Sequence, residues 1–289
     1  MTLLSSRSIQ PVDPGLLSRA LEVAGRLAND ASDVITATAG RGARPESKDS
    51  PFDWVTDTDR TLERHTRRVL ASEFPGIPVH GDAYGADEEI DAAPYRWVVD
   101  PVDGTTNYVA GIPWCAYSLA LLDEHGPVVG VVADPYRAQI YAAARGRGTR
   151  ANGTPVKLAD KSEVAGAVMC TEWTKTGPWP GMDNFIARAA KARAGVRVLG
   201  SAALSVAQVA LGHAAAAVLH GYHEWDVAGA VALAVESGAV VLDRRGSGDP
   251  LPLDGLLVAA PGVADEVLTW WQESLDVAAT RSDPQRLPT

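Results

Sequence analysis

Two aspartates three positions apart, Asp100 and Asp103, are the side chains of this sequence that most directly suggest chemistry. They lie in the segment Trp97-Val-Val-Asp-Pro-Val-Asp-Gly-Thr-Thr-Asn107, where a short apolar strand ends. Two such carboxylates repel each other unless a cation lies between them. Oxygen ligands favour Mg²⁺, Mn²⁺ or Ca²⁺ over zinc, and the amides at the start of a following helix suit a phosphate. The segment therefore predicts a phosphoryl-transfer site, with a plain surface turn as the alternative.

Two further acidic segments could add ligands. The first runs from Lys48 to Asp59, and the second begins at Glu224-Trp225-Asp226. Aspartate also favours the first turn of a helix, because it complements the helix dipole, so each segment has a purely structural interpretation as well. The sequence contains no zinc-type histidine spacing, no Ser-His-Asp order and no P-loop.

Apolar periodicity predicts the elements that position these acids. Asp13 and Pro14 are typical of a helix start. We expect helices over residues 14–35, 58–72, 183–193, 202–211, 226–237 and 263–275, and the start of another helix at Thr105. We expect strands over residues 97–99, 116–122, 128–132, 139–144, 196–199, 214–219, 239–242 and 256–260. An antiparallel sheet with helices thus precedes a region of alternating helix and strand, which divides the chain into residues 1–152 and residues 153–289.

Composition limits the class of protein. Of 289 residues, 46% are hydrophobic, which excludes a disordered chain, and the net charge is −10, which argues against nucleic-acid and membrane partners. Residues 198–223 carry no charged side chain, and their many alanines predict a buried helix and strand rather than a membrane span. Two cysteines, Cys115 and Cys170, suit small buried side chains in a reducing compartment. With no signal-peptide pattern at the start, we expect a soluble, cytoplasmic protein.

The three acidic segments, in this order, resemble the motifs of the inositol monophosphatase family of Mg²⁺-dependent, lithium-sensitive phosphatases. Gly200-Ser-Ala-Ala-Leu204 also fits, and the resemblance covers roughly residues 15–275. It implies an α/β fold, a layered α-β-α-β-α sandwich of the inositol monophosphatase and fructose-1,6-bisphosphatase type. It also implies hydrolysis of a small phosphate monoester, two or three Mg²⁺ ions with Mn²⁺ as a substitute, and a homodimer.

The resemblance assigns roles position by position. The implied metal ligands are Asp82, Asp100, the Val102 carbonyl, Asp103 and Asp226. Gly104 and Thr105 would present backbone amides to the phosphate, Asp59 would hold the Thr105 hydroxyl that orients the attacking water, and Lys48 would lie near the outer metal shell. Two cations facing an in-line attack agree with this arrangement, because one activates water and the other stabilises the leaving oxygen.

One departure from the family pattern concerns catalysis. Members usually carry Gly-Glu-Glu before the Asp-Pro motif, whereas this chain has Gly81-Asp82-Ala83. Asp82 keeps the charge on a side chain one methylene shorter, and Ala83 loses the second acid. We expect a working but altered metal site, and a catalytically weakened protein that binds metal or a phosphorylated ligand is the alternative of another class.

A second departure concerns the substrate. Inositol-selective members carry a glutamate seven residues before the metal-binding aspartate, where this chain has Leu219, so recognition of an inositol hydroxyl is in doubt. Glu224 resembles the histidinol-phosphatase branch and would suit a cationic amine. Histidinol phosphate and a sugar or nucleoside phosphate are therefore alternative substrates. The expected substrate contacts are Ser201, Ala202, Leu219, His220 and Glu224, with Tyr222 as a further candidate.

Overall fold

Helices and strands alternate in five layers in the computed structural model, which describes residues 12–41, 45–47, 54–88, 90, 93–158 and 161–282. The helices are α1 (Pro14–Thr38), α2 (Asp57–Glu73), α3 (Thr105–Ala110), α4 (Met182–Lys191), α5 (Ala202–Ala210), α6 (Glu224–Ser237) and α7 (Ala264–Ser282). A short 3₁₀ turn, η1, spans Pro135–Arg137. None of the helices in these ranges is long and apolar enough to cross a membrane.

The larger sheet has eight strands in the order β10-β9-β8-β7-β6-β5-β3-β4 and is antiparallel except where β3 meets β5. Its strands are β3 (Val79–Gly81), β4 (Gly85–Ala86), β5 (Arg96–Asp103), β6 (Ala116–Asp123), β7 (Gly126–Asp134), β8 (Gln139–Ala144), β9 (Thr149–Ala151) and β10 (Thr154–Val156). The expected division at residue 152 falls inside the β9–β10 hairpin, and the sheet continues to Val156.

The smaller sheet has five strands in the order β12-β11-β13-β15-β14. Its strands are β11 (Val168–Thr171), β12 (Gly195–Val198), β13 (Ala216–Leu219), β14 (Val240–Leu242) and β15 (Leu256–Ala259). The pairs β11–β12 and β11–β13 are parallel and the other two pairs are antiparallel. A separate pair, β1 (Glu46–Ser47) and β2 (Trp54–Val55), precedes α2.

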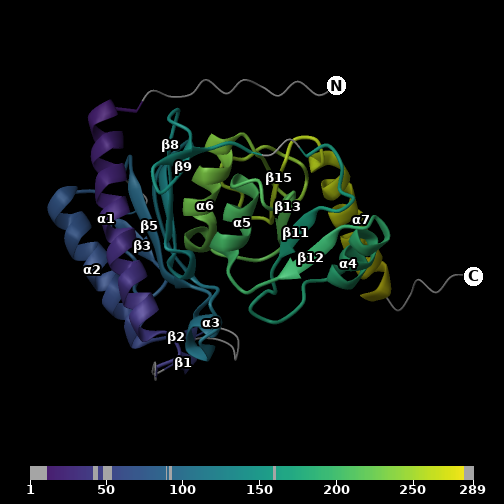
Figure 1. Cartoon of the computed structure of the whole chain (residues 1–289), viewed down its shortest axis with the longest axis horizontal. Coiled ribbons are helices and arrows are strands. Elements are labelled where there is room, and N and C mark those ends of the chain that lie inside the picture. Colours follow the sequence, from purple (N-terminus) through teal and green to yellow (C-terminus); the bar gives the residue numbers. More distant parts are fainter. Residues whose placement is uncertain are drawn as a thin grey trace, which may run out of the picture.

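The layers run α1 and α2, large sheet, α5 and α6, small sheet, α4 and α7 (Figure 1). Each interface has its own apolar core, with Leu27 and Trp97 in the first, Val206 and Val231 in the second, and Trp271 in the third. The predicted α-β-α-β-α sandwich is thus confirmed. The charge-free segment forms α5 and β13 in the middle of the molecule, and both cysteines are buried and free, as expected.

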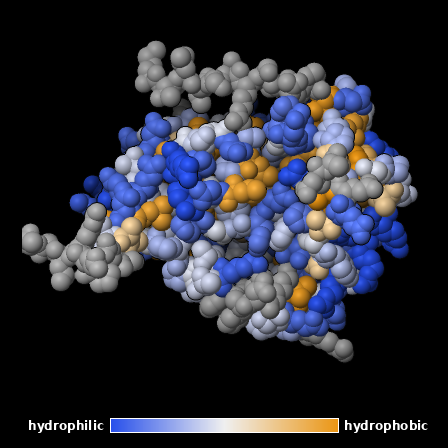
Figure 2. All heavy atoms as spheres, turned by 180° about the vertical axis from the view of Figure 1, so that it is seen from behind, coloured by the Kyte–Doolittle hydropathy of each residue, from blue (hydrophilic) through white to orange (hydrophobic). Residues whose placement is uncertain are grey.

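Local sequence explains the helix starts. Asp13 accepts a hydrogen bond from the Leu16 amide at 2.7 Å, and Pro14 occupies the first helical position of α1. Thr56 and Asp59 form a reciprocal capping box at α2. On the face drawn in Figure 2 hydrophilic side chains predominate, and hydrophobic ones gather in small patches, as in an ordinary globular surface.

The structure also differs from the sequence-based elements in three places. β11 was not predicted, and neither were the short strands β1, β2, β4, β9 and β10. α7 continues to Ser282, beyond the expected end at residue 275. β5 extends to Asp103, so Asp100 and Asp103 lie within the strand rather than after it.

Candidate active site

β5 carries Asp100 and Asp103 through an irregularity in the sheet. Asp100 pairs with Ser118 of β6 and Asp103 with Ala116, so the register shifts between the two aspartates. Their exposed fractions are only 4% and 6%. The irregularity explains why the sequence looked like a turn, because Pro101 interrupts the regular ladder without ending the strand.

Asp103 joins the two halves of the chain. Its carboxylate accepts hydrogen bonds from the Ser201 hydroxyl, the Ala203 amide at 2.9 Å and the Ala202 amide at 3.3 Å, all at the start of α5. Burial raises the pKa of Asp103 to about 6, and these three donors act against that rise. Ser201 therefore touches Asp103 and does not line the cavity, whereas Ala202 does.

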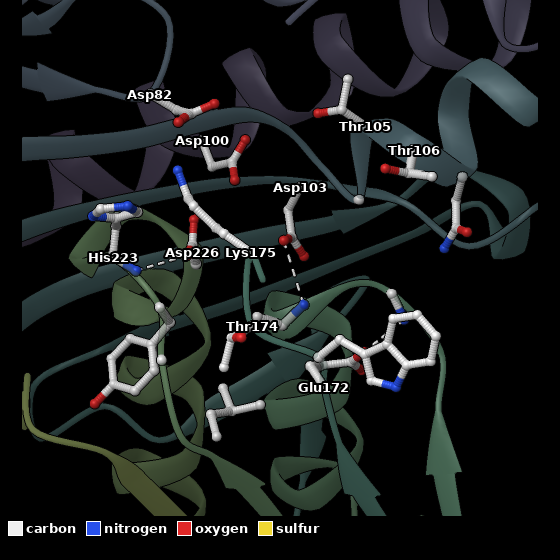
Figure 3. A pocket seen from close by; sticks show the side chains of 18 of the residues that line it. Asp82, Asp100, Asp103, Thr105, Thr106, Glu172, Thr174, Lys175, His223 and Asp226 are labelled. Carbon is white, nitrogen blue, oxygen red and sulfur yellow. Dashed lines mark hydrogen bonds between the residues drawn. The ribbon is translucent and has the colours of Figure 1, made fainter. Parts of the chain in front are cut away.

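Four aspartates converge on one open cavity of about 770 Å³ (Figure 3). Asp82 follows β3, Asp100 and Asp103 come from β5, and Asp226 comes from the first turn of α6. Burial and then the charges of Asp82 and Asp103 raise the pKa of Asp100 well above its usual value. Burial and then the charge of Asp103 raise the pKa of Asp226 in the same direction. Mutual repulsion of this kind is what a bound cation would relieve.

Asp226 caps a helix and also faces the cavity. Its Oδ2 accepts a hydrogen bond from the His223 amide at 2.7 Å and so caps α6. It also lines the cavity beside the other aspartates. A capping role fixes the carboxylate at the N-terminus of the helix, so the two roles support each other.

Thr105 lies at the start of α3, next to the aspartates. Its hydroxyl is 2.8 Å from the Val102 carbonyl oxygen and 3.4 Å from Asp59 Oδ1. Asp59 is fully buried, and burial raises its pKa to about 6 although hydrogen bonds from Thr56 oppose the rise. The structure therefore places Asp59 at the Thr105 hydroxyl, and it adds a hydrogen bond from that hydroxyl to the Val102 carbonyl.

The donor set fits a hard divalent cation, because every candidate ligand is a carboxylate or carbonyl oxygen. The candidate ligands do not form a complete coordination site in this structure. Within the described ranges, no three or more His, Cys, Asp or Glu side chains lie close enough together to hold a metal ion. Figure 3 shows the side chain of Lys175 directed toward Asp82, Asp100 and Asp226. A bound ion would therefore require local rearrangement of side chains.

Some of the predicted substrate contacts line the cavity and others do not. Ala202, Leu219 and Tyr222 line the cavity. His220 does not line it and instead stacks on Trp179, with ring centroids 5.7 Å apart. Lys48 lies outside the described residues.

Glu224 is also absent from the cavity wall. Its carboxylate accepts hydrogen bonds from His80 at 2.7 Å and Arg96 at 2.9 Å. Burial acts to raise the pKa of Glu224, but these two partners hold it below its usual value. The expectation that Glu224 binds a cationic substrate is wrong for this structure, because its charge is already matched inside the protein.

Glu172 is a site residue that the sequence analysis missed. It follows β11, lines the cavity, and accepts hydrogen bonds from the Gly200 amide at 2.7 Å and the Ser205 hydroxyl at 2.6 Å. Burial raises its pKa to about 7. An acid directly after a buried apolar strand is the pattern that singled out Asp100, so recognising β11 would have revealed Glu172.

Known proteins resemble this chain over most of its length. The model of the inositol monophosphatase family matches residues 16–275. Inositol-1-monophosphatase ImpA of Mycolicibacterium smegmatis is 32% identical over 262 residues, which cover 89% of this chain and 93% of that protein. The solved Thermotoga maritima IMPase has a TM-score of 0.83 at 25% identity, over 90% of this chain and 99% of that one. An IMPase/NADP phosphatase complexed with Mg²⁺ and phosphate has a TM-score of 0.77 at 22% identity, over 88% and 95% of the two chains.

Proposed function

The chain belongs to the inositol monophosphatase family of phosphoric monoester hydrolases, and from this premise we propose that it hydrolyses the phosphate monoester of a small polar metabolite with Mg²⁺ and an activated water. The observation that carries the proposal is the convergence of Asp82, Asp100, Asp103 and Asp226 on one cavity, with Thr105 at its edge. Two or three Mg²⁺ ions, replaceable by Mn²⁺, match that charge.

Each residue has a proposed task. Asp82, Asp100, Asp103, Asp226 and the Val102 carbonyl hold the cations. Bound Mg²⁺ supplies a water of lowered pKa and stabilises charge on the leaving oxygen. The Thr105 hydroxyl, which donates a hydrogen bond to Asp59, orients the attacking water. The amides of Gly104 and Thr105 bind the phosphate.

The residues that line the cavity limit which substrates fit it. Leu219 supplies no acceptor for an inositol hydroxyl. Aromatic side chains line the cavity, namely Trp54, Trp173, Tyr222 and Trp225. They support a second candidate, a nucleoside phosphate whose base stacks on a ring. Histidinol phosphate was favoured because Glu224 could bind its cationic amine. Glu224 is instead paired with Arg96 and His80, so this argument for histidinol phosphate no longer holds.

The assembly and location are also proposals. On the family resemblance we propose a homodimer, which light scattering of the purified protein tests. The buried, free Cys115 and Cys170 suit the reducing cytoplasm, which we propose as the compartment.

The test is phosphate release from a panel of monoesters, measured with Mg²⁺, with EDTA, and with Mg²⁺ plus Li⁺. The panel contains inositol 1-phosphate, histidinol phosphate, fructose 1,6-bisphosphate and 3′-phosphoadenosine 5′-phosphate. We expect release with Mg²⁺ only and inhibition by Li⁺. Asp103→Asn should abolish release, and the control Asp57→Asn, which changes an exposed aspartate at the start of α2, should not.

Two results would contradict the proposal. Full activity of Asp103→Asn would remove the metal assignment. A protein that binds Mg²⁺ by calorimetry but releases no phosphate from any monoester would instead be the binding homologue that the Asp82-Ala83 departure suggested.

A further inference from the structure

A tight turn presents Lys175 to the acidic cavity. Thr174 and Gly177 exchange backbone hydrogen bonds of 2.8 and 3.0 Å, which close a turn with Lys175 and Thr176 at its tip. The Thr174 hydroxyl also donates to the Gly177 carbonyl at 2.9 Å. Glu172 anchors the base of the turn through the start of α5. The backbone of the turn is therefore fixed, and only the lysine side chain is long enough to move far.

The Lys175 side chain extends from that turn toward the carboxylates. Figure 3 shows its nitrogen in the space bordered by Asp82, Asp100 and Asp226. All four residues line the same cavity. The ammonium group of Lys175 and these carboxylates carry opposite charges and attract each other across this space. A positive charge of the protein thus lies where the proposed function requires a metal ion.

We propose that Lys175 is a tethered counter-cation of the metal site, which balances the aspartates of the metal-free protein and must swing out when the divalent ion binds. The inference rests on the proposed function. An ammonium group and a divalent ion repel each other, so each weakens the binding of the other to the same carboxylates. Lys175 is exposed, so its side chain can turn toward solvent by rotation about its own bonds.

The consequence is a competition that lowers metal affinity. Free energy that Lys175 contributes to the metal-free protein is lost when metal binds, so removing its charge strengthens metal binding. Ion pairs of partly exposed groups are weak, and an effect of about three- to fivefold in Kd is the expected size. The competition also weakens with added salt, because screening reduces the attraction of the lysine.

The test is calorimetric titration of the metal-free full-length protein with Mn²⁺ and with Mg²⁺, without substrate. Lys175→Met keeps the length and removes the charge, and Lys175→Arg keeps the charge. Lys191→Met, an exposed lysine of α4, is the control for net charge. We expect Lys175→Met to bind metal about three- to fivefold more tightly, with the other two variants within twofold of the parent. In EDTA, Lys175→Met should also unfold at a lower temperature than the parent.

The outcomes separate this inference from the proposed function. If the parent protein binds metal and releases phosphate but Lys175→Met binds metal equally well or more weakly, the inference is overturned and the proposed function stands. Binding by Lys175→Met in the absence of binding by the parent supports it. Absence of binding by both proteins overturns the inference and the metal-dependent function together.

Discussion

Gly104 forms the turn from β5 into α3, at the residue that separates Asp103 from Thr105. Its φ is +86°, in the left-handed region, and an added Cβ would lie 2.7 Å from the Gly200 carbonyl oxygen. We expect Gly104→Ala to lower the free energy of unfolding by about 2–4 kcal/mol, because backbone strain and a steric clash add. Urea denaturation monitored by tryptophan fluorescence measures the loss.

Gly76 provides a matched control. It has the same φ of +86°, but nothing lies within 4 Å of a Cβ added there. We expect Gly76→Ala to cost only the strain, about 1–2 kcal/mol. Equal losses in the two variants would show that the contact with Gly200 has no effect on stability.

The sequence predicts the position of some site residues well and of others poorly. Asp100, Asp103 and Asp226 were found because a short motif joins them to a recognisable strand or helix. Glu224 was misassigned, since its partners Arg96 and His80 are remote in sequence and only tertiary packing brings them to it. Lys175 carried no local signal at all, because a lysine in a loop is ordinarily solvated.

At the scale of elements, α2 supports the turn that carries Asp82. Glu63 of α2 accepts hydrogen bonds from the Ala83 amide at 2.7 Å and the Tyr84 amide at 3.3 Å, and it pairs with Arg67 at 2.8 Å. The side chain of Glu63 is fully buried. A carboxylate from the helix thus contacts the segment in which this chain departs from the Gly-Glu-Glu pattern, and it fixes the backbone there.

We expect Glu63→Ala to lower the free energy of unfolding by about 3 kcal/mol, because it removes the buried carboxylate that accepts from two partly buried amides and leaves Arg67 with Asp87 as its remaining acidic partner. We also expect weaker Mg²⁺ activation, because Asp82 loses its fixed backbone. Glu73→Ala removes more exposed ion pairs with Arg19 and Arg26 and should cost less than about 1 kcal/mol. Denaturation midpoints and Mg²⁺ titration of activity measure both effects, and a Glu63→Ala protein as stable as Glu73→Ala would refute the supporting role.

Elements with strong apolar periodicity were predicted well, and those defined by pairing were not. The helix starting at Asp13 and Pro14 and the strands β6 to β8 follow from patterns within one segment. β5 was predicted too short, because Asp100-Pro101 has the composition of a turn while its pairing with Ser118 of β6 extends the strand. β11 lies between β12 and β13, but its residues, Val168–Thr171, do not alternate between apolar and polar side chains, so no period marks it as a strand.

At the scale of the whole molecule, the site depends on both halves of the chain. The large sheet supplies Asp100 and Asp103, while α5 and α6 supply the donors to Asp103 and the carboxylate of Asp226. The sequence predicted two successive regions but could not predict their contact, because nothing local links Asp103 to Ser201. Acidic residues from distant segments are thus buried together, and their charge repulsion affects the stability of the entire fold.

Stability of the metal-free protein should therefore depend on pH in a definite direction. Burial raises the pKa of Asp59 and Asp103 to about 6 and that of Glu172 to about 7, and it raises those of Asp100 and Asp226 as well. Between pH 4 and 7 these groups bind more protons in the folded than in the unfolded state, so the free energy of unfolding falls as pH rises. For one group whose pKa moves from 3.8 to about 6, the loss is about 3 kcal/mol.

We expect the unfolding temperature in EDTA to fall steadily from pH 5 to pH 8. Saturating Mg²⁺ should reverse the fall above pH 7, because the ion binds only the ionised carboxylates of the folded state. His220 acts against the trend, since burial lowers its pKa, but it is one group against several. Asp103→Asn should show a shallower fall in EDTA and a smaller response to Mg²⁺. If the unfolding temperature of the parent protein in EDTA stays level or rises across this range, the buried aspartates do not have the raised pKa values on which this prediction depends.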